Sequence, residues 1–268
     1  MKNIKNILAV LAITFLLTSC NDDDNNVLTN ISGNGNLSVE FDNSYNGNDL
    51  ILNAANGANS NGEILKITTA KYIVSNIVLT NENGTTFTYP KSNSYFIVDE
   101  SNASSLFLDL NNVPAGNYTK IKFGIGVDQA QWDLGADGQG DFLAQAQAAD
   151  LMWSWSAGYK FLAIEGEFTA PTVASETLFM VHTGKTGTDY NYTEITLDLP
   201  TKALVRTSIT PEIHIIADLS KITDGANKIK LADHNMGGMG AMIMGGATLP
   251  LITQNVNGMF VVGHVHND

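Results

Sequence analysis

Short runs of alternating apolar and polar residues dominate this chain and constrain its fold more than any other feature. The first four are residues 36–42, 71–80, 85–90 and 94–100. β-Branched and aromatic residues are frequent in them, and Asn, Gly, Ser or Pro bounds each run, which is the pattern of β-strands joined by turns. Runs of the same kind continue through 211–219. We therefore expect an all-β domain, an antiparallel β-sandwich.

One stretch, residues 140–155, breaks this pattern because it is rich in Ala and Gln and has no β-branched residue. Its residues are good helix formers, so we expect one short helix inserted between strands. Apolar residues recur there at roughly helical spacing, which predicts that the helix packs on the sandwich. These residues are Phe142, Leu143, Ala146, Ala149, Leu151 and Trp153.

The first twenty residues have the pattern of a secretion signal. Lys2 and Lys5 precede an apolar run that is too short to span a bilayer as a mature helix. The run ends in "LTSC", and these small residues before Cys20 resemble the lipobox of bacterial lipoproteins. We therefore expect residues 1–20 to be a lipoprotein signal peptide that ends at Cys20, and Cys20 to be acylated and to anchor the protein in a lipid bilayer.

Residues 21–36 are acidic, rich in Asn, and too polar to bury a core, so we expect a flexible tether there. Acidic residues directly after a lipidated cysteine also resemble a surface-export signal. We expect an outer-membrane lipoprotein at the cell surface, and a periplasm-facing anchor is the alternative. The remaining residues 37–268 suit one large β-sandwich domain.

Charge and cysteine content limit the partners and the metal ligands. The chain has 14 Lys and Arg against 27 Asp and Glu, a net charge of −13, and losing Lys2 and Lys5 would bring it to about −15. This acidity argues against nucleic acid, whose phosphates require basic patches. Cys20 is the only cysteine, so a metal site in the folded domain has to use His, Met, carboxylate or backbone oxygen.

The segment from Leu151 to Phe168, "LMWSWSAGYKFLAIEGEF", has two tryptophans two residues apart, a Gly-Tyr pair and an apolar-Glu-Gly strand. With "KIKFGIGV" upstream and "FMVHTG" downstream, it resembles the MbnP-like domain family. The residues that match the pattern of this family are Phe123, Gly124, Gly126, Met152, Trp153, Trp155, Gly158, Tyr159, Glu165, Gly166, His182 and Gly184.

The resemblance implies a secreted, usually lipid-anchored β-sandwich whose better-known members bind copper through histidines and an oxidised tryptophan, kynurenine. Trp153 and Trp155 are the candidates for this modification. The Trp-x-His pair of a well-known copper-binding relative does not occur here, so that site does not transfer whole. The resemblance also implies a haem protein or a transport receptor as partner. The aromatic residues of the segment equally suit plain core packing, because such side chains bury large areas.

Where no thiolate is available, copper ions prefer imidazole and thioether, so the histidines are the first residues to consider as copper ligands. His182 lies in the family's His-x-Gly turn and is the leading candidate. His264 and His266 are two residues apart, so in a strand they project on one face and can bind one ion together. His214 lies in an apolar strand, and we expect it to be satisfied in the core.

The glycine-rich segment 234–246 contributes His234 and a group of methionines that includes Met236 and Met239. Methionine is flexible and polarisable, so it can gather round a soft cation or fill an irregular apolar gap. We expect a supplementary soft-metal site or a filler loop there. Calcium is a harder alternative, which three aspartates on a glycine-rich turn leave open although their spacing departs from an EF-hand. They are Asp133, Asp137 and Asp141.

Neither a Gly-x-Ser-x-Gly elbow nor a His-Glu-x-x-His helix occurs in the sequence, and we expect no enzyme. We predict a surface or periplasm-facing lipoprotein that binds a metal ion, copper first, for acquisition or sequestration. The alternative is a module that binds no metal and contacts glycan or a partner protein through its aromatic and Asn-rich loops.

Overall fold

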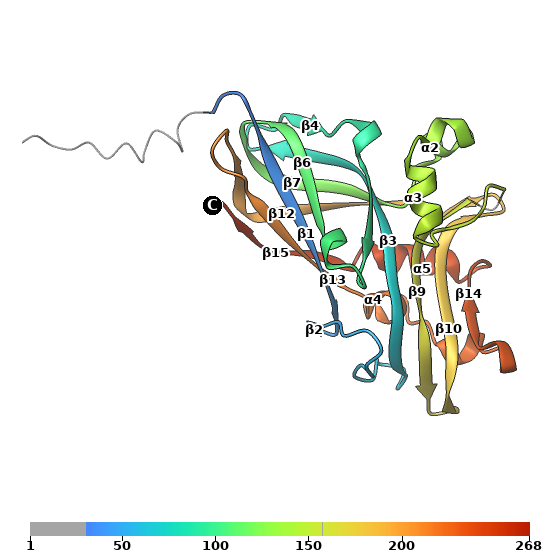
Figure 1. Cartoon of the computed structure of the whole chain (residues 1–268). Helices are drawn as coiled ribbons and strands as arrows, with labels where there is room; N and C mark the ends of the chain where they lie inside the picture. Colours follow the sequence, from blue (N-terminus) through green and yellow to red (C-terminus); the bar gives the residue numbers. More distant parts are fainter. Residues whose placement is uncertain (1–30, 157) are drawn as a thin grey trace, which may run out of the picture.

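The computed structural model describes residues 31–156 and 158–268, which form two curled β-sheets with small helices (Figure 1). The arrangement is a β-sandwich, as the alternating runs predict. Cys20 lies outside the described residues, so its acylation stays a prediction. No helix in the described part of the chain is long and apolar enough to cross a membrane.

The smaller sheet has five strands in the described residues, in the order β15-β13-β1-β2, with β6 also paired to β1. β1 runs parallel to β13, and the other pairs are antiparallel. The strands are β1 Asn34–Tyr45, β2 Asn48–Asp49, β6 Phe107–Pro114, β13 Glu212–Asp218 and β15 Phe260–His266.

The larger sheet has ten strands in the same residues, with the order β11-β10-β9-β3-β7-β12 along its main path. β14 adds a parallel edge to β10, β8 pairs with β9, and β4 and β5 pair with β3. The strands are β3 Ile64–Asn81, β4 Thr86–Thr88, β5 Tyr95–Asp99, β7 Gly116–Ile125, β8 Met152–Ser154, β9 Gly158–Ala170, β10 Val173–Thr186, β11 Asp189–Tyr190, β12 Thr193–Val205 and β14 Ala241–Ile243.

The core between the sheets is centred on four aromatic rings. Phe41 and Phe260 come from the smaller sheet, and Tyr72 and Phe123 come from the larger one. Their edge-to-face contacts include ring centroids 5.5 Å apart for Phe41 and Phe123 and 5.2 Å apart for Phe123 and Phe260. Such pairs contribute about 0.5–1.5 kcal/mol each beyond the area that they bury. The rings therefore hold the two sheets at a fixed separation without any disulfide.

The helix expected over 140–155 is shorter than predicted. It is α3, Phe142–Ala148, and Asp150 ends it by adopting a left-handed φ of 58°, while residues 152–154 form a strand. Phe142 and Ala146 are buried in a second apolar cluster with Ile73, so α3 packs on the sandwich as expected. The other helical segments are η1 Lys91–Asn93, η2 Ala103–Leu106, α2 Gln129–Trp132, η3 Ala136–Gln139, α4 Lys221–Asp224, η4 Leu231–His234, η5 Gly237–Met239 and α5 Leu249–Val256.

Candidate functional site

The first candidate ligand, His182, projects from β10 on the side of the larger sheet that faces away from the core. Successive side chains of a strand point to opposite faces of the sheet, and the preceding residue, Val181, belongs to the main core. The His182 side chain is only 4% exposed, and its Nε2 lies 2.7 Å from Oε1 of Glu165 on β9. Glu165 stands opposite Met180 in the strand register, so it reaches His182 diagonally.

The buried environment controls the protonation of this imidazole. Burial lowers the pKa of His182 below its ordinary value of 6.5, and this effect outweighs the opposing attraction of Glu165. Nδ1 is also buried, and it has no hydrogen-bond partner among the described residues. In the neutral ring, Nε2 therefore donates its proton to Glu165, and the free lone pair is on Nδ1.

Trp153 lies beside this imidazole, with ring centroids 5.9 Å apart. It projects from β8, which pairs with the start of β9. Gly184 makes room for it, because a Cβ at that position would lie 2.8 Å from the Trp153 ring and 2.5 Å from the carbonyl oxygen of Tyr159. The His-x-Gly segment, expected from the sequence to be a turn, lies inside β10, and Gly184 allows the tryptophan to approach the histidine two residues earlier.

Methionines follow the same face of the sheet. In the parallel pairing of β10 with β14, Met180 stands opposite Met242, and His182 is the next residue of β10 on the same face. Met244 follows directly after the end of β14. The three methionines are half-buried. Met244 and Trp153 line a hollow of about 440 Å³ at the surface. The flexible thioethers of Met180 and Met242 therefore lie on the face of the sheet that carries the buried imidazole of His182.

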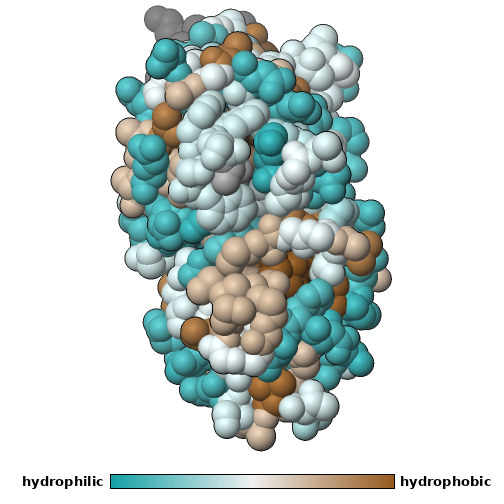
Figure 2. All heavy atoms as spheres, turned by 90° about the vertical axis from the view of Figure 1, so that its right-hand side faces the viewer, coloured by the Kyte–Doolittle hydropathy of each residue, from teal (hydrophilic) through white to brown (hydrophobic). Residues whose placement is uncertain are grey.

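The sequence pointed to a different part of this methionine segment. Met236 and Met239 are 52% and 58% exposed, and Nε2 of His234 lies 3.5 Å from the Thr248 hydroxyl. Figure 2, which views the molecule from the side of β10 and β14, shows apolar side chains gathered in the lower half of this face. The first half of the segment is a surface loop, and the second half, from Met242, reaches the surroundings of His182.

The other predicted histidines lie on the smaller sheet. His264 and His266 are exposed neighbours on β15, with ring centroids 4.5 Å apart. The expectation that His214 is satisfied in the core was wrong, because it lies on the outward face of β13 with its ring centroid 4.4 Å from that of His264. Pairing between strands distant in the sequence causes this contact, so periodicity alone could not reveal it.

The remaining candidates do not join either histidine region. Trp155 stacks on Trp132 with ring centroids 4.1 Å apart, which leaves Trp153 as the tryptophan next to His182. The three aspartates proposed for calcium, Asp133, Asp137 and Asp141, have exposed side chains. Across residues 31–156 and 158–268, no group of three or more His, Cys, Asp or Glu side chains converges to hold a metal ion.

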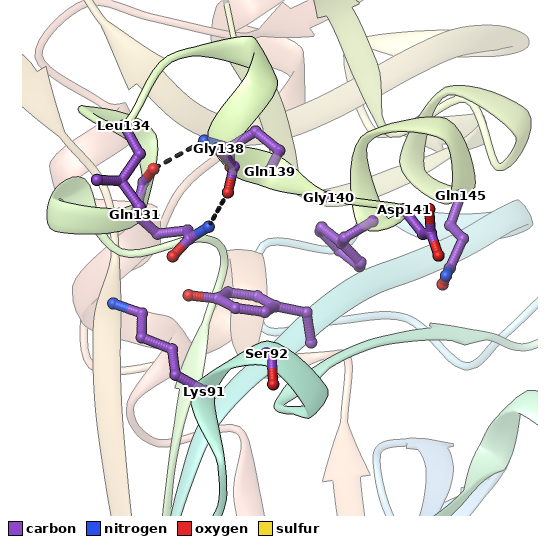
Figure 3. Close-up of a pocket in the computed structure, with 11 residues that line it drawn as sticks. Lys91, Ser92, Gln131, Leu134, Gly138, Gln139, Gly140, Asp141 and Gln145 are labelled. Carbon is purple, nitrogen blue, oxygen red and sulfur yellow. Dashed lines mark hydrogen bonds between the residues drawn. The ribbon is translucent and has the colours of Figure 1, made fainter.

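A second hollow, of about 450 Å³, lies between α3 and the loop that precedes it (Figure 3). Two of its polar side chains, those of Gln131 and Gln139, form hydrogen bonds within the loop. The Gln131 side chain donates to the Gly138 carbonyl at 2.8 Å, and the Gln139 side chain donates to the Gln131 carbonyl at 2.7 Å. These bonds hold the loop in shape and occupy the side-chain amides of Gln131 and Gln139.

Beside this hollow, Asp128 collects three polar partners. Lys91 Nζ and the Tyr95 hydroxyl each lie 2.8 Å from its carboxylate, and the Asn76 amide lies 2.9 Å from it. Burial opposes ionisation of Asp128, but these hydrogen bonds outweigh it and lower the pKa to about 2. Asp128 also caps α2 by accepting from the Gln131 backbone N–H, so this network stabilises the turn rather than offering a free ligand.

Comparison with known proteins agrees with the pattern read from the sequence. No curated protein matches the chain. The solved structure of MbnP from Methylosinus trichosporium is similar over 79% of this chain and 81% of that one, with 15% identity and a TM-score of 0.48. A sequence profile of the MbnP family matches residues 34–243, a range that contains Trp153, Glu165 and His182 and ends before His264. Since this match covers most of the chain, the protein belongs to the MbnP family.

Proposed function

We propose that this protein binds a copper ion through Nδ1 of His182 and serves in copper acquisition or sequestration. The observation that carries the proposal is the hydrogen bond of Nε2 to Glu165 at 2.7 Å, combined with a buried Nδ1 that has no hydrogen-bond partner among the described residues. A metal-binding histidine usually donates its other ring N–H to a carboxylate, which fixes the tautomer and raises the basicity of the ligating nitrogen.

The state of the imidazole fits this role. A metal ion binds the neutral ring, and burial lowers the pKa of His182, so the ring is neutral at pH 7 without competition from a proton. An unpaired buried nitrogen costs about 1–3 kcal/mol, and a metal–ligand bond would remove this cost. Both properties follow from the burial of His182 on β10, which lies between β9 and β14.

The neighbours of His182 favour copper over a hard cation. This face of the sheet offers the imidazole of His182 and the thioethers of Met180 and Met242, and soft or borderline copper ions prefer both groups to carboxylate oxygen. The MbnP-like resemblance implies copper independently, together with an oxidised tryptophan. Trp153 is the candidate for that modification because its ring lies beside His182, whereas Trp155 stacks on Trp132. When bound, the copper ion would act as a soft Lewis acid that binds imidazole and thioether at this point of the sheet.

The cellular setting is part of the proposal. Acylation at Cys20 would tether the domain to the outer membrane. The segment between Cys20 and Asn34, where β1 begins before the expected end of the tether at residue 36, would let the domain reach a partner such as a haem protein or a transport receptor. The glycan or protein-binding alternative has less support, because Tyr159 and Phe161 are buried in the core and Trp155 already stacks on another ring.

The test is copper retention by purified protein loaded as Cu(I) under reducing conditions and then dialysed. Elemental analysis should find a copper ion that is lost in His182→Ala and in the smaller change His182→Gln. His234→Ala is the matched control, because His234 is half-buried in a different segment, and it should retain the wild-type copper content. Circular dichroism of each variant checks the fold. Full copper retention by both His182 variants would contradict the proposal.

A further inference from the structure

The smaller sheet carries a separate arrangement of imidazoles and carboxylates that the His182 site does not use. β13 lies between β1 and β15, and its register places Glu40 opposite His214 and His214 opposite His264. Ile213 and Ile215 point into the core, so His214 faces outward. One position along, Glu212 stands opposite His266. Residues from three strands thus meet on one rigid, outward surface.

The distances show that these side chains are in contact. The ring centroids of His214 and His264 are 4.4 Å apart, and those of His264 and His266 are 4.5 Å apart. Nε2 of His214 lies 3.3 Å from Oδ2 of Asp42 and 3.6 Å from Oε2 of Glu40. Three imidazoles and two carboxylates therefore occupy one patch.

A glycine lets this patch form. The pairing of β13 with β15 shifts register between His214 and Ile215, and Gly263 is the extra residue of the bulge. A Cβ on Gly263 would lie 3.0 Å from Nδ1 of His214, so a larger residue would push the ring away. That Nδ1 is buried and has no hydrogen-bond partner among the described residues. The histidine is thus held in place with one ring nitrogen unsatisfied and its other nitrogen facing carboxylates.

We infer that this patch binds a second metal ion, a divalent ion of the borderline class such as Zn(II) or Cu(II), with His214, His264 and His266 as imidazole ligands. Two imidazoles that share a tetrahedral metal ion at N–metal distances of about 2.0–2.1 Å have ring centroids about 5 Å apart. The separations in the patch, 4.4 and 4.5 Å, are somewhat shorter, so small movements of the rings would admit an ion. In the described part of the chain, no group of three such side chains is already arranged to hold a metal ion. Because His264 and His266 are exposed, rotation about their side-chain bonds can bring the nitrogens together.

The carboxylates complete the chemistry. Glu40 and Asp42 offset the charge of a divalent cation and can ligate it or orient His214, as carboxylates next to metal-bound imidazoles do. This second ion goes beyond the proposed function, since it uses no residue of the His182 site. His264 and His266 also lie outside residues 34–243, the range matched by the family profile. The two sites can therefore succeed or fail separately.

The test is calorimetric titration of the full chain with Zn(II), which has no redox chemistry and favours imidazole and carboxylate ligands. The double variant His264→Ala/His266→Ala changes only exposed side chains, so the fold should be kept, and the Zn(II) affinity should fall at least 100-fold. Glu40→Gln should weaken binding by about 10–100-fold if the carboxylate orients or ligates. His182→Ala and His234→Ala should bind Zn(II) at this patch as the wild type does.

Nuclear magnetic resonance of the histidine ring protons gives an independent readout. Zn(II) should shift or broaden the signals of His214, His264 and His266 together, and the assignment comes from the single variants. The inference is overturned if the double variant binds Zn(II) as tightly as the wild type, or if the wild type binds none. It is also overturned if Zn(II) perturbs only His182 or His234.

Discussion

Replacing Glu165 by Gln should weaken copper binding without removing the ligand itself. The carboxylate is 2.7 Å from Nε2 of His182, and the amide oxygen of Gln can still accept that hydrogen bond but carries no charge. Loss of such a supporting carboxylate costs about 10–100-fold in metal affinity, or about 1.4–2.7 kcal/mol. The Glu165 side chain is 26% exposed and thus partly screened by water, so we expect a value in the lower half of this range, about 10–30-fold.

Glu165→Ala should have a larger effect because no acceptor remains for a ring whose side chain is 4% exposed. We expect about 100-fold weaker copper binding, together with about 1–3 kcal/mol of lost stability from the unpaired buried N–H. Glu167→Gln is the matched control. Glu167 lies two residues along on the same strand face but pairs with Lys66 at 2.9 Å, so its loss should leave copper affinity unchanged.

Competition with a chromophoric Cu(I) chelator measures these affinities, and urea unfolding measures the stabilities. The reasoning would be refuted if Glu165→Gln and Glu165→Ala bound copper as tightly as wild type. It would also be refuted if Glu167→Gln weakened binding as much as Glu165→Gln, because the effect would then reflect surface charge rather than the bond to His182.

Burial lowers the pKa of His182 in the folded state below its ordinary 6.5, so below pH 6.5 the unfolded chain binds more protons at this residue than the folded chain does. The contribution of His182 to the free energy of unfolding should therefore be constant above pH 6.5 and should decrease as the pH falls below it. Urea titrations of His182→Gln should show a smaller decrease than those of the wild type. Gly184→Ala places a Cβ 2.5 Å from a backbone oxygen and 2.8 Å from Trp153, so it should lower the free energy of unfolding by about 1–3 kcal/mol and change the tryptophan fluorescence. Gly57→Ala is the control, because a Cβ there meets nothing within 4 Å and should change neither. Equal melting temperatures for the two variants would contradict this prediction. Asp128 has a pKa of about 2 in the folded state against an ordinary 3.8, so its contribution to stability is present above pH 3.8 and is lost as the pH falls towards 2. Asp128→Asn should be less stable than the wild type at pH 7, and the two should become equally stable in acid. A stability difference that does not depend on pH would count against the network of Lys91, Tyr95 and Asn76.

The fold was predictable because it depends on local patterns. Alternating runs such as 36–42 and 211–219 became β1 and β13, since each has to bury one face, and the turn residues between them set the strand ends. The helix was placed correctly but drawn too long, because Asp150 takes a left-handed conformation that composition does not signal. The two parallel pairs, β1 with β13 and β10 with β14, depend on long-range topology and were not expected.

The candidate site was predictable only in part. His182 and Trp153 were identified through the family pattern, and the structure adds that their ring centroids lie 5.9 Å apart. The hydrogen bond between Glu165 and His182 and the placement of Met242 opposite Met180 depend on strand register, which a single sequence does not fix. His214 was misjudged for the same reason, because its partners lie on β1 and β15, far away in the sequence.

Copper-edge anomalous diffraction from crystals of the copper-loaded protein tests the central claim most directly. The account predicts an anomalous peak about 2 Å from Nδ1 of His182, on the side of the ring away from Glu165. Nε2 of His182 should still be bonded to the Glu165 carboxylate. A map in which copper lies only at other residues, or in which Nδ1 of His182 has no copper within bonding distance, would contradict the account.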